Sequence, residues 1–216
     1  MKYLNQIMKK LSLENPTLIL MAGISASGKT IFTKELTKMI TDSFVIDKDT
    51  INEAFLFEHI DSEGNFDYFH GNSRRARDSI NQFYSKNVKF QSYQCMLDLA
   101  KDNLNHGKNP ILDGNYAKEI RGDYLDRIVF PFFQDTDCKI RIVYCHAREE
   151  VIKKRTIERG LRRDDSKLVS EQSWRDFLQE QPIIPSELDS YNHIKIDTEK
   201  PSGINVSEVS KYLISL

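Results

Sequence analysis

An apolar run leads into a glycine-rich turn and then into a helical pattern between Thr17 and Leu36, where the sequence reads TLILMAGISASGKTIFTKEL. The first six residues are uncharged and β-prone. Gly23 and Gly28 flank the turn, and glycine permits the positive φ angles and close backbone approach that a tight turn needs. A strand that passes through such a turn directly into a helix is a unit of α/β folds, so this stretch constrains the chain to that class.

The segment GISASGKT fits G-x-x-x-x-G-K-[ST], the pattern of a phosphate-binding loop, in the strand-to-helix position that the loop requires. Inward-facing backbone N–H groups and the positive end of the helix suit a phosphate chain. We expect Lys29 to reach the β- and γ-phosphates of ATP and the Thr30 hydroxyl to hold Mg²⁺. A glycine-rich turn that only opens a helix is the alternative. The predicted nucleotide-binding residues are Gly23, Ser25, Ala26, Ser27, Gly28, Lys29 and Thr30.

Five short apolar runs alternate with stretches of helical periodicity, a pattern that predicts a parallel sheet covered by helices. The sequence shows no internal repeat or linker, so we expect one domain over residues 1–216. The predicted strands span residues 17–22, 43–47, 110–115, 139–146 and 193–197. The clearest helical stripe consists of Tyr93, Leu97, Ala100 and Leu104 and stops at Gly107.

Charge and composition narrow the functional class. The net charge is −1 with acids and bases mixed, which disfavours a nucleic-acid or membrane-surface protein. The cysteines Cys95, Cys138 and Cys145 are odd in number and form no C-x-x-C pair, which disfavours disulfides and a zinc site. No window approaches the ~20 apolar residues of a membrane span, and no signal peptide is evident. We therefore expect a cytoplasmic protein with reduced thiols.

The second predicted strand ends in VIDKDTIN and so places Asp47 and Asp49 at the edge where ligands bind in parallel sheets. A carboxylate there can accept the proton of an attacking hydroxyl, and Asp49 is the better candidate because it lies past the strand end. The alternative is that Asp49 is the N-cap of the following helix. Asp47 is a candidate substrate residue, or a partner for a lysine or a backbone group.

The third predicted strand ends in ILDGNY. We expect Asp113 to reach the metal beside Thr30, directly or through water. The alternative is an Asx-turn that closes the strand. Asn115 and Tyr116 follow and are candidate substrate contacts that line the same crevice.

An arginine-rich stretch, AREEVIKKRTIERGLRRDD, follows the fourth predicted strand. Arg155 and Arg159 share a helical face, and Gly160 ends the helix. Guanidinium groups on a lid over residues 155–167 would neutralise developing charge and exclude water. A solvated helix whose arginines pair with nearby acids is the alternative, and Arg162 and Arg163 are weaker candidates for the lid.

Residues 58–89 form a polar, aromatic and basic segment too long for a simple connection, and we expect a helical insert on the substrate side. Its Arg74 is a candidate for binding an anionic acceptor, although a solvated helix face explains it equally well. His70 in the same segment is more simply incidental.

Together these motifs resemble the small P-loop kinases of the branch that includes zeta toxins, polynucleotide 5′-kinases, gluconate kinases and chloramphenicol phosphotransferases. The resemblance covers about Thr17 to Asp165 and resumes at IKIDTEKP. It implies a P-loop NTPase fold of three αβα layers with a five-stranded parallel sheet in the order 2-3-1-4-5, an arginine lid, ATP and Mg²⁺ as cofactors, and Asp49 as the base. Asn52 stands where toxin and polynucleotide members often carry an arginine, which weakens the transfer of a named substrate from any one subgroup.

The motifs and the resemblance predict a kinase that moves the γ-phosphoryl group of ATP to a hydroxyl. A small molecule or nucleotide sugar is the favoured acceptor. A polynucleotide 5′-hydroxyl is the alternative, and it is less favoured because no basic channel is evident. A regulatory nucleotide-binding switch is the alternative from another class, and the candidate base Asp49 argues against it. The oligomeric state and the acceptor are not defined by the sequence.

Overall fold

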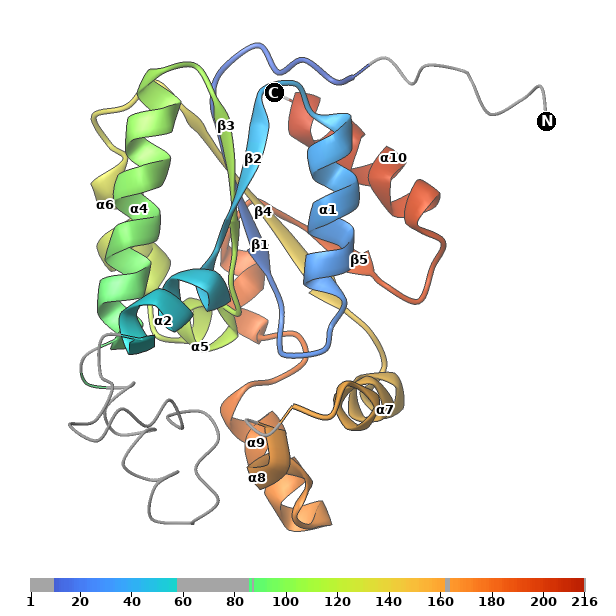
Figure 1. Cartoon of the computed structure of the whole chain (residues 1–216). Coiled ribbons are helices and arrows are strands. Elements are labelled where there is room, and N and C mark those ends of the chain that lie inside the picture. Colours follow the sequence, from blue (N-terminus) through green and yellow to red (C-terminus); the bar gives the residue numbers. More distant parts are fainter. Residues whose placement is uncertain (1–9, 58–85, 87, 162–163, 216) are drawn as a thin grey trace.

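The computed structural model describes residues 10–57, 86, 88–161 and 164–215. Strands and helices alternate along most of this length (Figure 1). The strands are β1 (Thr17–Ala22), β2 (Ser43–Asp47), β3 (Asn109–Asp113), β4 (Lys139–His146) and β5 (His193–Asp197). The helices are α1 (Lys29–Met39), α2 (Lys48–Phe57), α4 (Lys89–Asn105), α5 (Ala117–Arg121), η2 (Leu125–Val129), α6 (Phe130–Phe132), α7 (Glu149–Arg159), α8 (Asp165–Leu168), α9 (Glu171–Glu180), η4 (Ser186–Ser190) and α10 (Ser202–Ile214).

The strands form one parallel sheet in the order β2-β3-β1-β4-β5. This is the order that the sequence resemblance implied, and four strands have the expected bounds. The third differs, because β3 ends at Asp113 and not at Asn115. Gly114 and Asn115 therefore belong to the loop, where their polar backbone groups are free to contact other loops.

Alternate side chains of β1 separate the two faces of the sheet. Leu18 and Leu20 pack with α4 in one cluster, whereas Ile19 and Met21 pack with α1 and α10 in another. Figure 1 shows the resulting three layers, with α4 and α6 on one side of the sheet and α1 and α10 on the other. β1 is buried over its whole length, as a central strand covered on both faces should be.

The stripe predicted between residues 93 and 104 is confirmed, since all four of its residues are buried on α4. The helix ends where the sequence indicated, and Gly107 adopts a φ of 71° just beyond it. The backbone N–H of Gly107 donates to the carbonyl of Leu104 at 2.9 Å. This left-handed glycine helps to satisfy the carbonyls of the last turn.

The carboxyl ends of the strands all meet at one edge of the sheet, at the bottom of Figure 1, where α2, α5, α7, α8 and α9 also lie. A third apolar cluster sits at this edge. Its buried members are Ile24, Ala117, Ala147, Ile152, Trp174 and Phe177. None of the helices in the described ranges combines the length and apolarity needed to cross a bilayer.

Candidate active site

The loop between β1 and α1 needs glycine at its first position. Gly23 has a φ of 135°, and a Cβ built there would lie 2.2 Å from the carbonyl oxygen of Cys145 on β4. Ala26 has a φ of 64° and Gly28 a φ of 92°, so the chain reverses hand twice before α1 begins. Such alternation turns successive N–H groups toward one point and creates a concave anion site.

Gly28 is confined from another direction. A Cβ at this position would lie 2.9 Å from the Cβ of Thr198, which follows β5. The Thr198 hydroxyl also donates to the carbonyl of Ser27 at 2.7 Å. The residue after β5 thus packs against the loop and stabilises its conformation. In the sequence, Thr198 was indicated only as part of the IDT triplet of the family resemblance.

Lys29 opens α1, and its ammonium donates to the loop carbonyls of Gly23 and Ile24 at 2.7 and 2.9 Å. Burial lowers the pKa of Lys29, and the charge of Asp113 is the strongest of the effects that oppose this shift. Asp49 opposes it as well, so both carboxylates lie within electrostatic reach of the ammonium. Lys29 is therefore held inside the loop, where a phosphate chain would meet it.

Asp113 ends β3 beside the loop and is 4% exposed. Burial raises the pKa of its carboxyl, Lys29 and a hydrogen bond with the Thr30 side chain oppose the shift, and the neighbouring Asp47 adds to it. Its Oδ2 has no hydrogen-bond partner in the part of the chain that the structure describes. A hydroxyl beside a carboxylate with an unpaired oxygen is a donor set that fits Mg²⁺.

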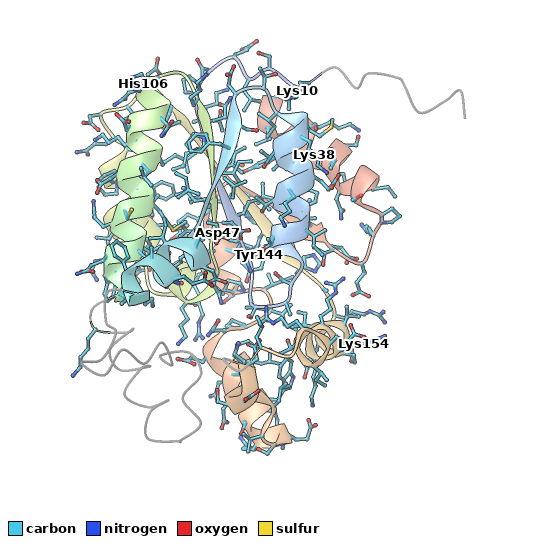
Figure 2. The ribbon with its side chains drawn as sticks, viewed as in Figure 1. Lys10, Lys38, Asp47, His106, Tyr144 and Lys154 are labelled. Atoms are coloured by element: carbon cyan, nitrogen blue, oxygen red, sulfur yellow. The ribbon has the colours of Figure 1, made fainter. Side chains whose placement is uncertain are left out.

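Asp47 lies opposite Asp113 in the register of β2 and β3, at the same edge as the loop (Figure 2). Its Oδ1 accepts the backbone N–H and the hydroxyl of Thr50 at 2.7 and 2.9 Å. Asp47 is therefore the N-cap of α2. The alternative that Asp49 caps this helix is wrong, because α2 begins one residue earlier, at Lys48.

Asp49 lies in the first turn of α2 and is exposed. Its charge opposes the lowering of the Lys29 pKa and adds to the rise of the Asp113 pKa, so Asp49 lies within electrostatic reach of both predicted site residues. The geometry is compatible with a base that a substrate can reach, and that role remains a prediction, as does substrate contact for Asp47.

Asn115 links the loops instead of standing free in a crevice. Its Nδ2 donates to Oε1 of Gln181 at 2.6 Å, and its carbonyl accepts the N–H of Gly23 at 2.9 Å. Tyr116 is 1% exposed, and its ring lies 5.3 Å from that of Tyr93. The expected place of Tyr116 in the open crevice is corrected, because its positive φ of 53° turns the ring into the core.

The two lid arginines have different partners. Arg155 donates through Nη1 and Nη2 to the hydroxyl and carbonyl of Thr198 at 2.9 and 3.2 Å. Arg159 donates through Nη2 to the hydroxyl of Ser25 in the loop at 2.5 Å and through Nε to Oδ2 of Asp164 at 2.7 Å. The pairing with an acid and the contact with the loop thus occur together on Arg159.

The comparisons with known proteins identify the family and the fold. The AAA_33 family model, described as an AAA domain, matches residues 18–182, well over half of the chain. The chain belongs to the AAA_33 family. Among curated proteins, a search for relatives of the AAA_33 chain finds no match.

Solved structures show the same fold as the AAA_33 chain. A protein from Chloroflexus aurantiacus J-10-fl has a TM-score of 0.59 and 16% identity, over 92% of this chain and 94% of that one. A sugar kinase from Janibacter sp. HTCC2649 has a TM-score of 0.55 and 13% identity, over 93% and 96%. The Mycobacterium tuberculosis APS kinase CysC, in complex with AMPPNP and APS, has a TM-score of 0.53 and 15% identity, over 93% and 99%. The fold is thus the P-loop NTPase-like αβα fold, while the narrower zeta-toxin or polynucleotide-kinase resemblance stays a prediction.

One part of the AAA_33 site escaped the sequence analysis. Trp174 on α9 is 1% exposed and packs in one cluster with Ile24 of the loop. Its indole N–H donates to Oε1 of Glu149 on α7 at 2.8 Å. The spacing of Trp174 and Phe177 on one helical face was the available signal. This cluster seats α7 and α9 of the AAA_33 chain against the loop.

Some predicted site residues of the AAA_33 chain lie outside the described residues. They are Arg74 of the expected insert, together with Arg162 and Arg163 of the lid. Their proposed contacts stay predictions.

Proposed function

We propose that the chain is an ATP- and Mg²⁺-dependent kinase that transfers the γ-phosphoryl group to a hydroxyl of a small molecule or nucleotide sugar. The proposal depends above all on one observation. Lys29, the Thr30–Asp113 pair and Asp49 converge at the end of β2 and β3, within electrostatic reach of one another. The sugar kinase and APS kinase with the same fold support this reaction class.

The residues at this edge divide the work of phosphoryl transfer. The loop N–H groups and Lys29 would hold the β- and γ-phosphates, while Thr30 and Asp113 would hold Mg²⁺. The metal, when bound, supplies charge neutralisation at the phosphate oxygens. Arg159 would reach the same phosphates from the Ser25 side of the loop. Positioning and charge account for most of the rate in such reactions, so this set is sufficient in kind.

Asp49 would accept the proton of the attacking hydroxyl as its oxygen bonds the γ-phosphorus, while the bond from that phosphorus to the β–γ bridging oxygen breaks and ADP leaves. Asp47 is less suited to that task because both of its contacts from Thr50 fall on one oxygen and serve as a helix cap. An exposed carboxylate beside the phosphate loop has no task in a regulatory nucleotide switch, which positions water and a partner surface instead. This difference favours a kinase over a switch. A polynucleotide 5′-hydroxyl is the second acceptor class to be tested.

We expect Asp49→Asn to leave nucleotide binding intact and to lower phosphoryl transfer by a factor of ~10² or more, the usual scale for loss of a general base. The protein is incubated with γ-labelled ATP, Mg²⁺ and a pooled metabolite extract, and the labelled product is identified by mass. A parallel reaction with 5′-hydroxyl oligonucleotides separates the two acceptor classes.

Asp102→Asn is the matched control for this experiment, since Asp102 is exposed on α4 at the opposite end of the molecule. It should transfer phosphate as the unmodified protein does. Transfer at a near-normal rate in Asp49→Asn would remove the role of base from this residue. A complete absence of labelled product with either acceptor class would contradict the kinase proposal itself.

The Asp113 variant tests the metal assignment. Asp113→Asn should keep or increase the rise in melting temperature that ATP alone produces, because a negative charge next to the phosphates is removed. The additional rise on adding Mg²⁺, expected in the unmodified protein, should disappear. Differential scanning calorimetry with ATP, with and without Mg²⁺, measures both quantities. An undiminished Mg²⁺ increment would show that Asp113 does not hold the ion.

A further inference from the structure

Asp164 is a buried carboxylate between α7 and α8, and only 1% of it is exposed. Its Oδ2 accepts the Nε–H of Arg159 at 2.7 Å, and its Oδ1 accepts the ammonium of Lys167 at 2.6 Å. A buried carboxylate is costly unless cations and hydrogen bonds surround it. Both oxygens of Asp164 meet a cation, so its charge is held in a defined position.

The same carboxylate is tied to the apolar cluster under the loop. The ammonium of Lys167 lies over the ring of Phe177, 4.6 Å from its centroid. Phe177 packs with Trp174 and with Ile24 of the phosphate-binding loop in one buried cluster. Asp164 is thereby anchored to packed elements and not to a surface loop alone.

On its other side, Asp164 orients a cation that faces the loop. Arg159 uses Nε for Asp164 and Nη2 for the Ser25 hydroxyl, 2.5 Å away. After burial and the neighbouring carboxylates, the charge of Arg159 is among the influences on the pKa of Lys29. The two cations therefore act on one region of the loop. The long side chain of Arg159 loses much rotamer freedom when it is fixed at the loop. Its hydrogen bond to Asp164 already restricts the side chain before a ligand binds.

We propose that Asp164 is a positioning residue, which holds the guanidinium of Arg159 over the loop in the orientation needed to neutralise charge on the phosphoryl group in transfer. Asp164 touches no substrate and acts through Arg159 alone. The inference rests on the proposed kinase activity and adds to it the group that aligns the arginine. It predicts that loss of Asp164 and loss of Arg159 are not independent.

The test is a double-variant cycle in the full chain with Asp164→Ala, Arg159→Ala and the double variant. The kcat and KM of ATP hydrolysis are measured by phosphate release with Mg²⁺. Asp164→Ala should lower kcat by about 10²-fold, the scale of a misplaced catalytic group, with little change in KM. Arg159→Ala should lower it by about 10³-fold, and the double variant should fall no further than Arg159→Ala.

Asp176→Ala is the matched control, because Asp176 is an exposed aspartate on α9, outside the lid. Its kcat should equal that of the unmodified protein. Melting temperatures without ligand are recorded for every variant, and the assays are run well below the lowest of them. Losses that multiply in the double variant would overturn the proposal, as would a kcat for Asp164→Ala within threefold of normal.

A second readout separates failure of this inference from failure of the kinase proposal. The dissociation constants of AMPPNP and of ADP with aluminium fluoride, a mimic of the phosphoryl group in transfer, are measured for the same proteins. Only the second constant should rise in Asp164→Ala, with no further rise when Arg159→Ala is added. An unmodified protein that gives no labelled transfer product would count against the kinase proposal, yet these dissociation constants would still decide the role of Asp164, since additive rises would overturn it.

Discussion

Lys29→Met should abolish the thermal stabilisation that ATP·Mg²⁺ gives to the unmodified protein. With ATP at one hundred times its dissociation constant, a bound ligand stabilises the native state by about 2.7 kcal/mol. For a chain of this size, that corresponds to a rise in melting temperature of roughly 5–11 °C. The ammonium lies inside the loop, 2.7 and 2.9 Å from two of its carbonyls, so the substitution removes the cation that the loop holds for the phosphates. Differential scanning fluorimetry with and without ATP·Mg²⁺ measures the effect.

The ligand-free melting temperature of Lys29→Met should stay the same or rise. Burial lowers the pKa of Lys29, so the charged form is disfavoured in the folded state, and an apolar chain of similar length relieves that cost. Lys38→Met is the matched control on the same helix, at its far end from the loop (Figure 2). It should keep the full shift. A normal ATP shift in Lys29→Met would remove the phosphate-loop assignment.

The loop and its setting were predictable because their signals are local. An apolar run such as TLILMA strongly predicts a buried strand. The helices that cover the sheet are predicted by the alternation of apolar runs with stretches of helical periodicity. The backbone conformation and the close neighbours at positions 23 and 28 both require glycine. The sequence motif shows these two glycines directly. The strand order itself came from the family resemblance, since no local signal encodes it.

The end of β2 shows where local signals become ambiguous. Asp47 and Asp49 have the same preference for an N-cap, so a shift of two residues in the start of α2 would move the cap from Asp47 to Asp49. The pairing of β2 with β3 decides where β2 ends and α2 begins. Local sequence preferences do not define that boundary. Tyr116 is a similar case, because its ring enters the core through a positive φ that is rare for tyrosine.

The lid arginines were found from their spacing, but their partners were out of reach of the sequence. The contact of Arg155 with Thr198 joins residues 43 apart in the chain, and that of Arg159 with Ser25 joins residues 134 apart. Helical periodicity predicts a shared face and says nothing about what that face meets. The structure thus divides a pair that the sequence treated as equivalent.

This division predicts unequal effects of removing the two arginines. Arg159→Ala should lower the rate of phosphoryl transfer by about 10³-fold, the lower end of the range for an arginine that stabilises the transferred group. Arg155→Ala should lower it much less, because the Arg155 guanidinium bonds Thr198 and not the loop side chain. Single-turnover transfer from γ-labelled ATP, measured for both variants at saturating nucleotide, compares the two directly.

Arg155→Ala should also lower the stability of the fold. Arg155 connects α7 to the residue after β5, so Arg155→Ala should lower the melting temperature through the loss of its two hydrogen bonds to Thr198.

Arg159→Lys keeps the charge but lacks the planar fork that reaches Asp164 and Ser25 together, and it should recover only part of the lost rate. Arg175→Ala on α9 removes an exposed arginine and serves as the control for both. Equal rate losses in Arg155→Ala and Arg159→Ala would mean that the contact with Ser25 has no special part in transfer, and full recovery by Arg159→Lys would reduce the role of Arg159 to that of a positive charge.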